Sequence, residues 1–315
     1  MILQHNALHS ITKYDDLLKY TKALRNFNVT DVYNKKLDAI NDFFREEKLD
    51  SAVVGLSGGL DSSLVLMLLL HASAKKDSPI KVINGCFMPI YSPGITGQDT
   101  ARMYVDHLNS QANKYTCYKY SKLDLSPASM AYRQVVGTTT NWHIGQIDSI
   151  VRTPALYGMA AKLQTHDFKS IVVGTTNRDE GAYIGFFGKA SDGMVDLQPI
   201  ADLHKSEVKA LASLCNVPDE IINRPPMGDV WDAKVDEEMF GATYEILEMF
   251  QILLENDQLE VINNIEDKPE LIKSCLNIIA QHKKNAHKYY KNNNYLISYG
   301  YGKYLDVMQR NIKIA

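Results

Sequence analysis

The segment 53–63 constrains the fold of this chain more than any other, because it joins a strand, a glycine-rich loop and the start of a helix. It reads Val-Val-Gly-Leu-Ser-Gly-Gly-Leu-Asp-Ser-Ser, and an apolar run over 64–70 follows it. The β-branched residues predict a buried parallel strand, and the apolar run predicts a buried helix. Unsatisfied N–H groups and the helix dipole favour an anion at the start of such a helix. The segment therefore predicts an anion-binding loop.

The residues of this loop suit a phosphate that is bound together with a metal ion. Gly58 and Gly59 allow the backbone to approach a phosphate closely, and the hydroxyls of Ser57 and Ser62 can add hydrogen bonds. The carboxylate of Asp61 would repel a phosphate, but it is a suitable ligand for a Mg²⁺ ion that bridges to the phosphates. The alternative is a plain turn of Gly and Ser residues between a strand and a helix.

The loop differs from the Walker A sequence, which requires a Lys before its final Ser or Thr. It resembles instead the Ser-Gly-Gly-x-Asp-Ser signature of the ATP pyrophosphatase (PP-loop) enzymes. That resemblance implies ATP as co-substrate. Members of this family adenylate a carbonyl or carboxyl oxygen, release pyrophosphate, and then displace AMP with a nitrogen or sulfur nucleophile.

Composition narrows the class of protein further. The chain has 315 residues and a formal net charge of −3, which argues against a nucleic-acid partner. Its four cysteines, at positions 86, 117, 215 and 275, are scattered and suit reduced thiols in the cytoplasm. The start of the chain lacks the pattern of a signal peptide, and the apolar run over 64–70 is far shorter than the ~20 residues of a membrane span. We therefore expect a soluble cytoplasmic protein without a membrane partner.

Strand and helix patterns alternate along the chain. Strands are expected over 51–56, 80–88, 115–120 and 169–174, and helices over 37–48, 64–70, 98–110 and 147–163, the last despite Pro154. This order predicts an α/β fold with a doubly wound, mainly parallel sheet flanked by helices, similar to the Rossmann-like adenine nucleotide alpha hydrolase folds. Ligands bind such sheets at the carboxyl ends of the strands, where Ser57 and Thr175 are expected.

Two parts of unequal size are expected. Residues 1–32 are interpreted as an N-terminal helical extension, and residues 33–315 as a single domain with a helical C-terminal part. The extension carries Leu17, Leu18, Leu24 and Phe27, which predict a helix that packs either on the body of the protein or on a partner.

A second informative segment spans 174–209. It reads Gly-Thr-Thr-Asn-Arg-Asp-Glu at 174–180, Gly-Phe-Phe-Gly-Lys-Ala-Ser-Asp-Gly at 185–193, and continues with Val-Asp-Leu-Gln-Pro-Ile at 195–200 and Leu-His-Lys-Ser-Glu-Val at 203–208. Together with the loop at Ser57, these motifs resemble the ammonia-dependent NAD synthetases, from about residue 34 to residue 244 or beyond.

The resemblance implies ATP-dependent amidation of deamido-NAD by free ammonia, with NAD, AMP and pyrophosphate as products. It implies a homodimer that shares the acceptor site across its interface, and a Mg²⁺ ion held by Asp61 and Glu180. The residues that match ATP-binding positions are Gly55, Ser57, Gly58, Gly59, Asp61, Ser62, Thr175 and Lys205. Those that match deamido-NAD-binding positions are Arg152, Tyr157, Lys189, Asp196, His287 and Lys288.

The chemistry of the reaction supports these roles. A carboxylate that attacks the α-phosphate brings negative charges together, so a cation and a lysine are needed, and Asp61 with Lys205 are candidate catalytic residues. Ammonia needs little beyond proximity to attack an acyl adenylate, but its proton must be removed, and Asp192 is a candidate for that step. Plainer interpretations remain open, namely first-turn acids for Asp179 and Glu180, solvated lysines, and a turn at Asp192.

The chain also departs from the family pattern at three positions. The family places Arg-x-Arg before a tyrosine, and here the first arginine is Ile150 while the second is Arg152. Met227 follows Pro-Pro where the family has a Ser or Thr on the ATP phosphates, and Met239 replaces an acid. Arg133 and Arg178 are candidates to supply the charge that is missing at Ile150.

A His-Lys pair near the C-terminus is also implied for substrate binding. The chain offers the pair at 282–283 and the pair at 287–288, and the second is preferred because Asn285 precedes it. Two other hypotheses remain beside NAD synthetase. One is a related ligase that adenylates a different carboxylate, favoured by Ile150 and Met227, and the other is a non-catalytic nucleotide-binding relative.

Overall fold

A parallel sheet forms the centre of the protein. The computed structural model describes residues 10–91, 97–224, 236–289 and 303–304. The sheet has the strand order β3-β2-β1-β4-β5-β6, and each neighbouring pair is parallel. The strands are β1 (Ser51–Leu56), β2 (Val82–Phe87), β3 (Tyr118–Lys122), β4 (Ser170–Val173), β5 (Leu197–Gln198) and β6 (Lys303–Tyr304). The expected α/β fold with a mainly parallel sheet is therefore confirmed.

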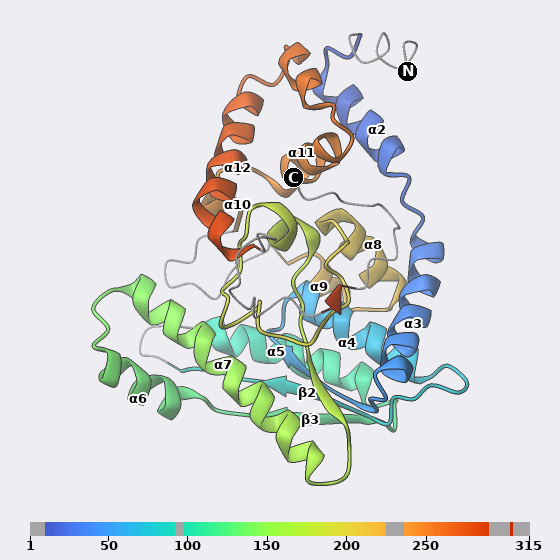
Figure 1. Cartoon of the computed structure of the whole chain (residues 1–315), viewed down its shortest axis with the longest axis vertical. Helices are drawn as coiled ribbons and strands as arrows, with labels where there is room; N and C mark the ends of the chain where they lie inside the picture. Colours follow the sequence, from blue (N-terminus) through green and yellow to red (C-terminus); the bar gives the residue numbers. More distant parts are fainter. Residues whose placement is uncertain (1–9, 92–96, 225–235, 290–302, 305–315) are drawn as a thin grey trace.

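Helices cover both faces of this sheet (Figure 1). On one face, β1 packs Ala52 and Val54 into a core shared with helices α3 (Val29–Glu46), α4 (Leu60–Ser73) and α8 (Lys205–Leu214). On the other face, Val53 packs with helix α7 (Asn141–Gln164), near Leu156 and Ala160. Because alternate residues of β1 enter different cores, both sets must be apolar.

The helices of the described chain have the following bounds. They are α2 (Tyr14–Arg25), α3 (Val29–Glu46), α4 (Leu60–Ser73), α5 (Gly97–Ala112), α6 (Ser126–Val136), α7 (Asn141–Gln164), α8 (Lys205–Leu214), α9 (Asp219–Ile222), α10 (Asp236–Phe240), α11 (Tyr244–Glu255) and α12 (Leu271–Asn285), with a π-helical turn η1 (Asp179–Tyr183) and 3₁₀ turns η2 (Leu259–Asn264) and η3 (Ala286–Lys288). None of these helices combines the length and the apolar composition that a membrane span requires.

Helix α4 follows the glycine-rich loop and is buried on all sides, as its uninterrupted apolar run predicts. Its residues 64–70 are at most 3% exposed. Gly59 precedes the helix as its N-cap in an extended conformation, and Gly58 has a φ of +75°. A Cβ atom at Gly58 would lie 2.8 Å from the carbonyl oxygen of Ala101. Because of this positive φ and the close approach of α5, only glycine fits at position 58 without strain.

A second core lies at the upper end of the molecule in Figure 1, where α10, α11 and α12 pack beside α2. Leu17 of α2 is fully buried in this core, and Tyr14 donates hydrogen bonds to Asp267 and Glu245. Helix α2 therefore packs on the body of the protein. The boundary expected between residues 32 and 33 falls within α3, and the division into an extension and one domain stays a prediction.

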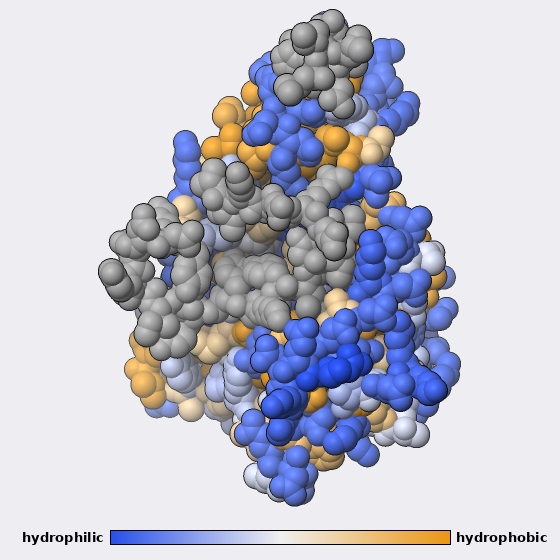
Figure 2. Space-filling view, turned by 45° about the vertical axis from the view of Figure 1, so that its right-hand side comes forward, coloured by the Kyte–Doolittle hydropathy of each residue, from blue (hydrophilic) through white to orange (hydrophobic). Residues whose placement is uncertain are grey.

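The surface reflects this distribution of polar and apolar residues. Figure 2 shows hydrophilic residues over most of the lower right of the face in view, and hydrophobic residues near its upper end, where Figure 1 places α11 and α12. Ile272 and Leu276 of α12 are half or more exposed.

Some elements of the structure differ from those expected from the sequence. Strand β3 covers Tyr118–Lys122 and not 115–120, because it is an edge strand whose polar, mostly exposed residues carry little hydrophobic signal. Helix α6 was not expected at all, since Ser129 is its sole buried residue and its apolar side chains face outward. Helix α7 begins at Asn141, six residues before its predicted start, and continues through Pro154 as expected.

Candidate active site

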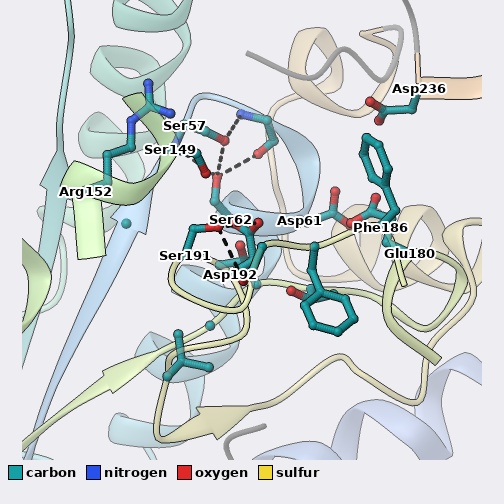
Figure 3. A pocket seen from close by; sticks show the side chains of 18 of the residues that line it. Ser57, Asp61, Ser62, Ser149, Arg152, Glu180, Phe186, Ser191, Asp192 and Asp236 are labelled. Carbon is teal, nitrogen blue, oxygen red and sulfur yellow. Dashed lines mark hydrogen bonds between the residues drawn. The ribbon is translucent and has the colours of Figure 1, made fainter. Parts of the chain in front are cut away.

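A cavity of about 1080 Å³ opens at the carboxyl ends of the central strands. Leu56 at the end of β1, Phe87 at the end of β2 and Val173 at the end of β4 all line it. This edge of a doubly wound sheet is where ligands of such folds bind. Figure 3 shows Ser57 and Ser62 near the middle of the cavity, with Arg152 on one side and Glu180 and Asp236 on the other.

The glycine-rich loop is held closed by its own hydroxyl groups. Ser57 N donates to Ser62 Oγ at 3.3 Å, the two Oγ atoms lie 3.1 Å apart, and Gly59 N donates to Ser57 Oγ at 3.2 Å. Ser62 Oγ in turn donates to the carbonyl of Gly59 at 3.1 Å. Of the predicted ATP-binding residues beyond these, Gly55, Asp61, Thr175 and Lys205 line the cavity as well, whereas Gly58 packs against Ala101.

Next to the loop, two carboxylates share one ammonium and one amide. Lys205 Nζ lies 2.5 Å from Asp61 Oδ2 and 3.4 Å from Glu180 Oε1. Asn177 Nδ2 donates to Asp61 Oδ1 at 3.1 Å and to Glu180 Oε1 at 2.7 Å. Residues from α4, the loop after β4, η1 and α8 therefore meet at one point, as the two motifs predicted for Asp61, Glu180 and Lys205.

A third carboxylate joins this group through a tyrosine. The hydroxyl of Tyr244, the first residue of α11, lies 2.8 Å from Glu180 Oε1 and 3.1 Å from Asp236 Oδ2. The Tyr244 hydroxyl has one proton, so it can donate to only one of these two carboxylates at a time. Burial raises the pKa of Glu180 to about 7, the ammonium of Lys205 opposes this rise, and the carboxylates of Asp61 and Asp236 add to it.

Lys205 remains charged in this setting. Burial lowers its pKa, but the carboxylates of Asp61 and Glu180 outweigh burial, so its pKa is raised above the usual value. Asp61 and Glu180, when both are ionised, carry more negative charge than the ammonium of Lys205 neutralises. The excess suits a divalent cation with oxygen ligands.

The carboxylates of Asp61 and Glu180 are of a kind that fits Mg²⁺, and their role as its ligands stays a prediction. Among the described residues, no group of three or more His, Cys, Asp or Glu side chains is placed to hold a metal alone. Mg²⁺ characteristically takes one or two carboxylates and completes its shell with phosphate oxygens and water. Asp61 and Glu180 beside a phosphate loop are such a pair.

The opposite side of the cavity is formed in part by α7. Arg152 of α7 lines this side, and so does Ile150, which is two residues earlier in the same helix. Arg152 lies across Ser57 from Glu180 and Asp236 in the view of Figure 3. Neither Arg133 nor Arg178 is among the described residues that line the cavity, because Arg133 pairs with Asp148 and Arg178 is buried against Glu255. They are therefore not placed to replace the missing arginine.

The basic residues of this side bond largely to backbone. Lys189 Nζ donates to the carbonyl of His287 at 2.9 Å. Lys288 Nζ donates to the carbonyls of Gly185 and Phe187 at 2.9 and 2.7 Å, and burial lowers its pKa. Lys189, His287 and Lys288 all line the cavity.

The alternative pair at 282–283 is not among the described residues that line the cavity. His282 stacks on the ring of Tyr183 at 4.2 Å and contacts the carbonyl of that residue through Nδ1. The preferred pair at 287–288 is thus the one that reaches the cavity, although its role stays a prediction.

Two predicted acceptor residues pair with each other. The hydroxyl of Tyr157 donates to Asp196 Oδ1 at 3.3 Å, and Val172 N donates to Asp196 Oδ2 at 2.7 Å. Burial and the carboxylate of Asp196 raise the pKa of Tyr157 to about 12. Neither side chain is among the described residues that line the cavity, so the structure does not bring them to the other predicted residues.

The remaining predicted positions vary in what the structure records. Asp192 lines the cavity, and its Oδ2 lies 3.3 Å from Ser191 Oγ, as Figure 3 shows. Met239 lines the cavity too, whereas Met227 lies outside the described residues.

Sequence reasoning assigned no role to Asn177, Tyr244 or Arg224. Arg224 lines the cavity, donates to the carbonyl of Gly58 at 3.3 Å and lies 5.0 Å from the centre of the Tyr104 ring. Asn177 stood within a motif already singled out, so its position three residues before Glu180 was a usable signal. Tyr244 and Arg224 come from distant segments, and no local pattern marked them.

The comparisons with known proteins agree with this geometry. Residues 32–292 match the family model described as NAD synthase. The chain is 34% identical to the NH3-dependent NAD+ synthetase of Picrophilus torridus over 258 residues, which covers 82% of this chain and 94% of that protein. It is 32% identical to the protein of the same name from Methanocaldococcus jannaschii, with 83% and 95% covered.

Solved structures share the fold. The NMN synthetase of Francisella tularensis has a TM-score of 0.66 at 22% identity, covering 85% of this chain and all of that one. The NH3-dependent NAD synthetase of Campylobacter jejuni has a TM-score of 0.61 at 22% identity, covering 82% and 95%. A parallel sheet with a phosphate loop, a carboxylate pair and a family model that matches most of the sequence lead to one conclusion: the chain belongs to the NAD synthase family.

Proposed function

We propose that this protein is an ammonia-dependent NAD synthetase, which amidates deamido-NAD with ATP and free ammonia and yields NAD, AMP and pyrophosphate. The observation that supports this best is the meeting of Asp61, Glu180 and Lys205 beside the closed loop of Ser57. The cavity, of about 1080 Å³, is large enough to hold the reacting parts of two nucleotides side by side. The family match and the curated relatives point the same way.

The first half-reaction takes place at the loop. The nicotinate carboxylate of deamido-NAD attacks the α-phosphorus of ATP, the bond to the β-phosphate oxygen breaks, and pyrophosphate leaves. Lys205 neutralises the phosphate charge, and the loop hydroxyls of Ser57 and Ser62 donate hydrogen bonds to phosphate oxygens. Asp61 and Glu180 would hold a Mg²⁺ ion, which supplies further charge neutralisation when bound.

The second half-reaction takes place between the loop and the far side of the cavity. Ammonia attacks the carbonyl carbon of the acyl adenylate, the bond to the AMP oxygen breaks, and one proton leaves the nitrogen. Asp192 is placed on the cavity wall and is our candidate for the group that accepts this proton. Arg152 and Lys189 supply positive charge on the side where the acceptor nucleotide would lie.

A homodimer and a cytoplasmic location also belong to this proposal. The outward surface of α6 and the start of α7 carries large apolar residues that are 47–85% exposed, which suits a protein interface. They are Met130, Tyr132, Val135, Val136 and Trp142. The four cysteines are all free thiols, which suits a reducing compartment. Sedimentation of the purified protein, with Val135→Glu as the variant expected to be monomeric, tests the dimer.

The activity is tested by incubating the purified protein with Mg-ATP, an ammonium salt and deamido-NAD, and by quantifying NAD and AMP chromatographically. NAD and AMP should form in equal amounts, and both should vanish with Asp61→Ala. A protein that binds ATP but forms no NAD would contradict the proposal.

Ile150 on the cavity wall favours one second candidate, a ligase that adenylates a carboxylate other than deamido-NAD. ATP–pyrophosphate exchange separates the two. Exchange that requires deamido-NAD supports the synthetase, whereas exchange that depends on another carboxylate supports the second candidate.

A further inference from the structure

A buried ion pair joins the N-terminal helix α2 to the helix that begins with Lys205. Arg25, the last residue of α2, is 3% exposed. Its Nε donates to Glu207 Oε1 at 2.7 Å, and its Nη2 donates to Glu207 Oε2 at 2.9 Å and to the carbonyl of Asp202 at 2.7 Å. A guanidinium that holds a carboxylate with two donors fixes its orientation as well as its charge.

Glu207 passes this constraint to the start of α8. It is the third residue of the helix, and its Oε2 accepts a hydrogen bond from the N–H of His204, the N-cap, at 2.9 Å. A carboxylate at the third helical position that accepts from the N-cap N–H fixes the first turn of a helix. The first residue of that turn is Lys205, whose ammonium lies between Asp61 and Glu180.

A second carboxylate secures the same turn from the opposite direction. Asp179 Oδ2 accepts from the backbone N–H of Lys205 at 2.7 Å, and Oδ1 lies 2.7 Å from His204 Nδ1. Asp179 is adjacent to Glu180, so the backbone of Lys205 and its carboxylate partner are fixed together. Of the two supports, Asp179 belongs to the conspicuous 174–209 segment, whereas Arg25 does not.

Arg25 also lies outside the family match, which begins at residue 32. Burying Glu207, which is 3% exposed, requires a cation, and Arg25 provides its ion pair. We propose that Arg25 is a positioning residue that sets the affinity for ATP by holding Glu207, and through it Lys205, in place. The inference rests on the proposed function, because it takes ATP to be the ligand of Lys205.

A merely structural role for Arg25 makes a different prediction. In that case any change that loosens α2 would lower stability and leave ATP binding untouched, or would weaken both in proportion. Tyr14→Ala provides the matched control, because Tyr14 is buried at the opposite end of the same helix, where its ring packs in the second core and its hydroxyl donates to Glu245.

The test measures the dissociation constant of Mg-ATP by titration calorimetry for wild type, Arg25→Gln, Arg25→Lys and Tyr14→Ala, with a thermal melt of each. Arg25→Gln should raise the dissociation constant roughly tenfold, since small misplacements of a charged group are costly. Arg25→Lys should fall between it and wild type, and Tyr14→Ala should bind as wild type despite a lower melting temperature. The KM for ammonium should not change in any variant.

Two outcomes would overturn the inference. One is an unchanged dissociation constant in both Arg25 variants, and the other is an equal rise in Tyr14→Ala. If Arg25→Gln does not fold, Arg25→Lys against Tyr14→Ala provides the same comparison. A wild-type protein that binds no Mg-ATP would contradict the proposed function itself, whereas ATP binding that ignores Arg25 would contradict this inference alone.

Discussion

The two ends of the cavity are built differently. At the end that we propose for ATP, the ATP end, Lys205 and Asn177 each contact the side chains of both Asp61 and Glu180. At the end that we propose for deamido-NAD, the acceptor end, the cavity-lining lysines Lys189 and Lys288 donate to loop carbonyls. The first arrangement holds charged side chains in place before any ligand binds. The second holds the backbone of the loops in place, so that few side-chain groups are left to select the ligand. We therefore expect substitutions at the two ends to change different kinetic constants.

The largest expected effect is at Lys205. Lys205→Met removes the ammonium that we propose faces the phosphates, and we expect the loss of one such preorganised charge to lower kcat/KM for ATP by roughly 100- to 1,000-fold. AMP release under steady-state conditions measures it. Lys162→Met, an exposed residue near the end of α7 that is not among the described residues lining the cavity, should remain close to wild type. A Lys205→Met protein with ordinary turnover would remove the distinction between the two ends.

Asn177 should matter next. Asn177→Ala deletes the amide that spans Asp61 and Glu180, and we expect a loss of about 10- to 100-fold in kcat/KM for ATP, because two charged acceptors lose a donor. The control is Asn256→Ala, whose amide bonds only to a carbonyl at the end of α11. Equal losses in the two variants would point to a general effect on stability and away from a role at the phosphates.

Substitutions on α7 should change the KM for the acceptor, deamido-NAD, and leave the KM for ATP unchanged. Arg152→Gln should raise the KM for deamido-NAD about tenfold, the magnitude of one charge-assisted hydrogen bond, with the KM for ATP unchanged. Ile150→Arg should lower the KM for deamido-NAD, because it returns positive charge to a cavity-lining position. Initial rates at varied concentrations of each substrate separate these constants. If ATP binding weakened in Arg152→Gln, the division of the cavity would be wrong.

The smallest catalytic effect is expected at Lys288, because its ammonium donates hydrogen bonds to two loop carbonyls. Lys288→Met should lower the free energy of unfolding by about 1–2 kcal/mol and change kcat little. Scanning calorimetry measures the first and initial rates the second. Lys284→Met, an exposed residue on the same cavity wall, is the control and should leave the melting temperature unchanged. A strong loss of kcat in Lys288→Met alone would place that lysine on the substrate.

The sequence predicted the ATP end better than the acceptor end, for a physical reason. Ser57, Asp61 and Ser62 lie within six residues, so one short pattern contains the loop, its hydroxyls and its acid. Asn177 lies three residues before Glu180 in the same motif, whereas Tyr244 is 64 residues away from Glu180 and contacts it only because the fold brings the two together. No local pattern contains such a contact.

The acceptor end shows the opposite problem. Tyr157 and Asp196 were named from their place in a family pattern, which carries no information on what each side chain contacts. In the folded chain they pair with each other. The sheet itself was predicted well where strands are buried on both faces, as in β1 and β4, and displaced at β3, where exposed polar residues at the sheet edge give no periodic signal.

The burial of α4 on all sides has a consequence for how such a protein can change over generations. Asp61 and Ser62 lie in the first turn of a helix that packs in the core against α3 and α8. Moving these two residues would therefore require compensating changes in both of those helices. The wall that carries Ile150 and Lys189 needs only single replacements. One part of the molecule can therefore diversify by ordinary drift while the other is inherited as a block, and descendants of this chain would be expected to change what they amidate sooner than how they activate it.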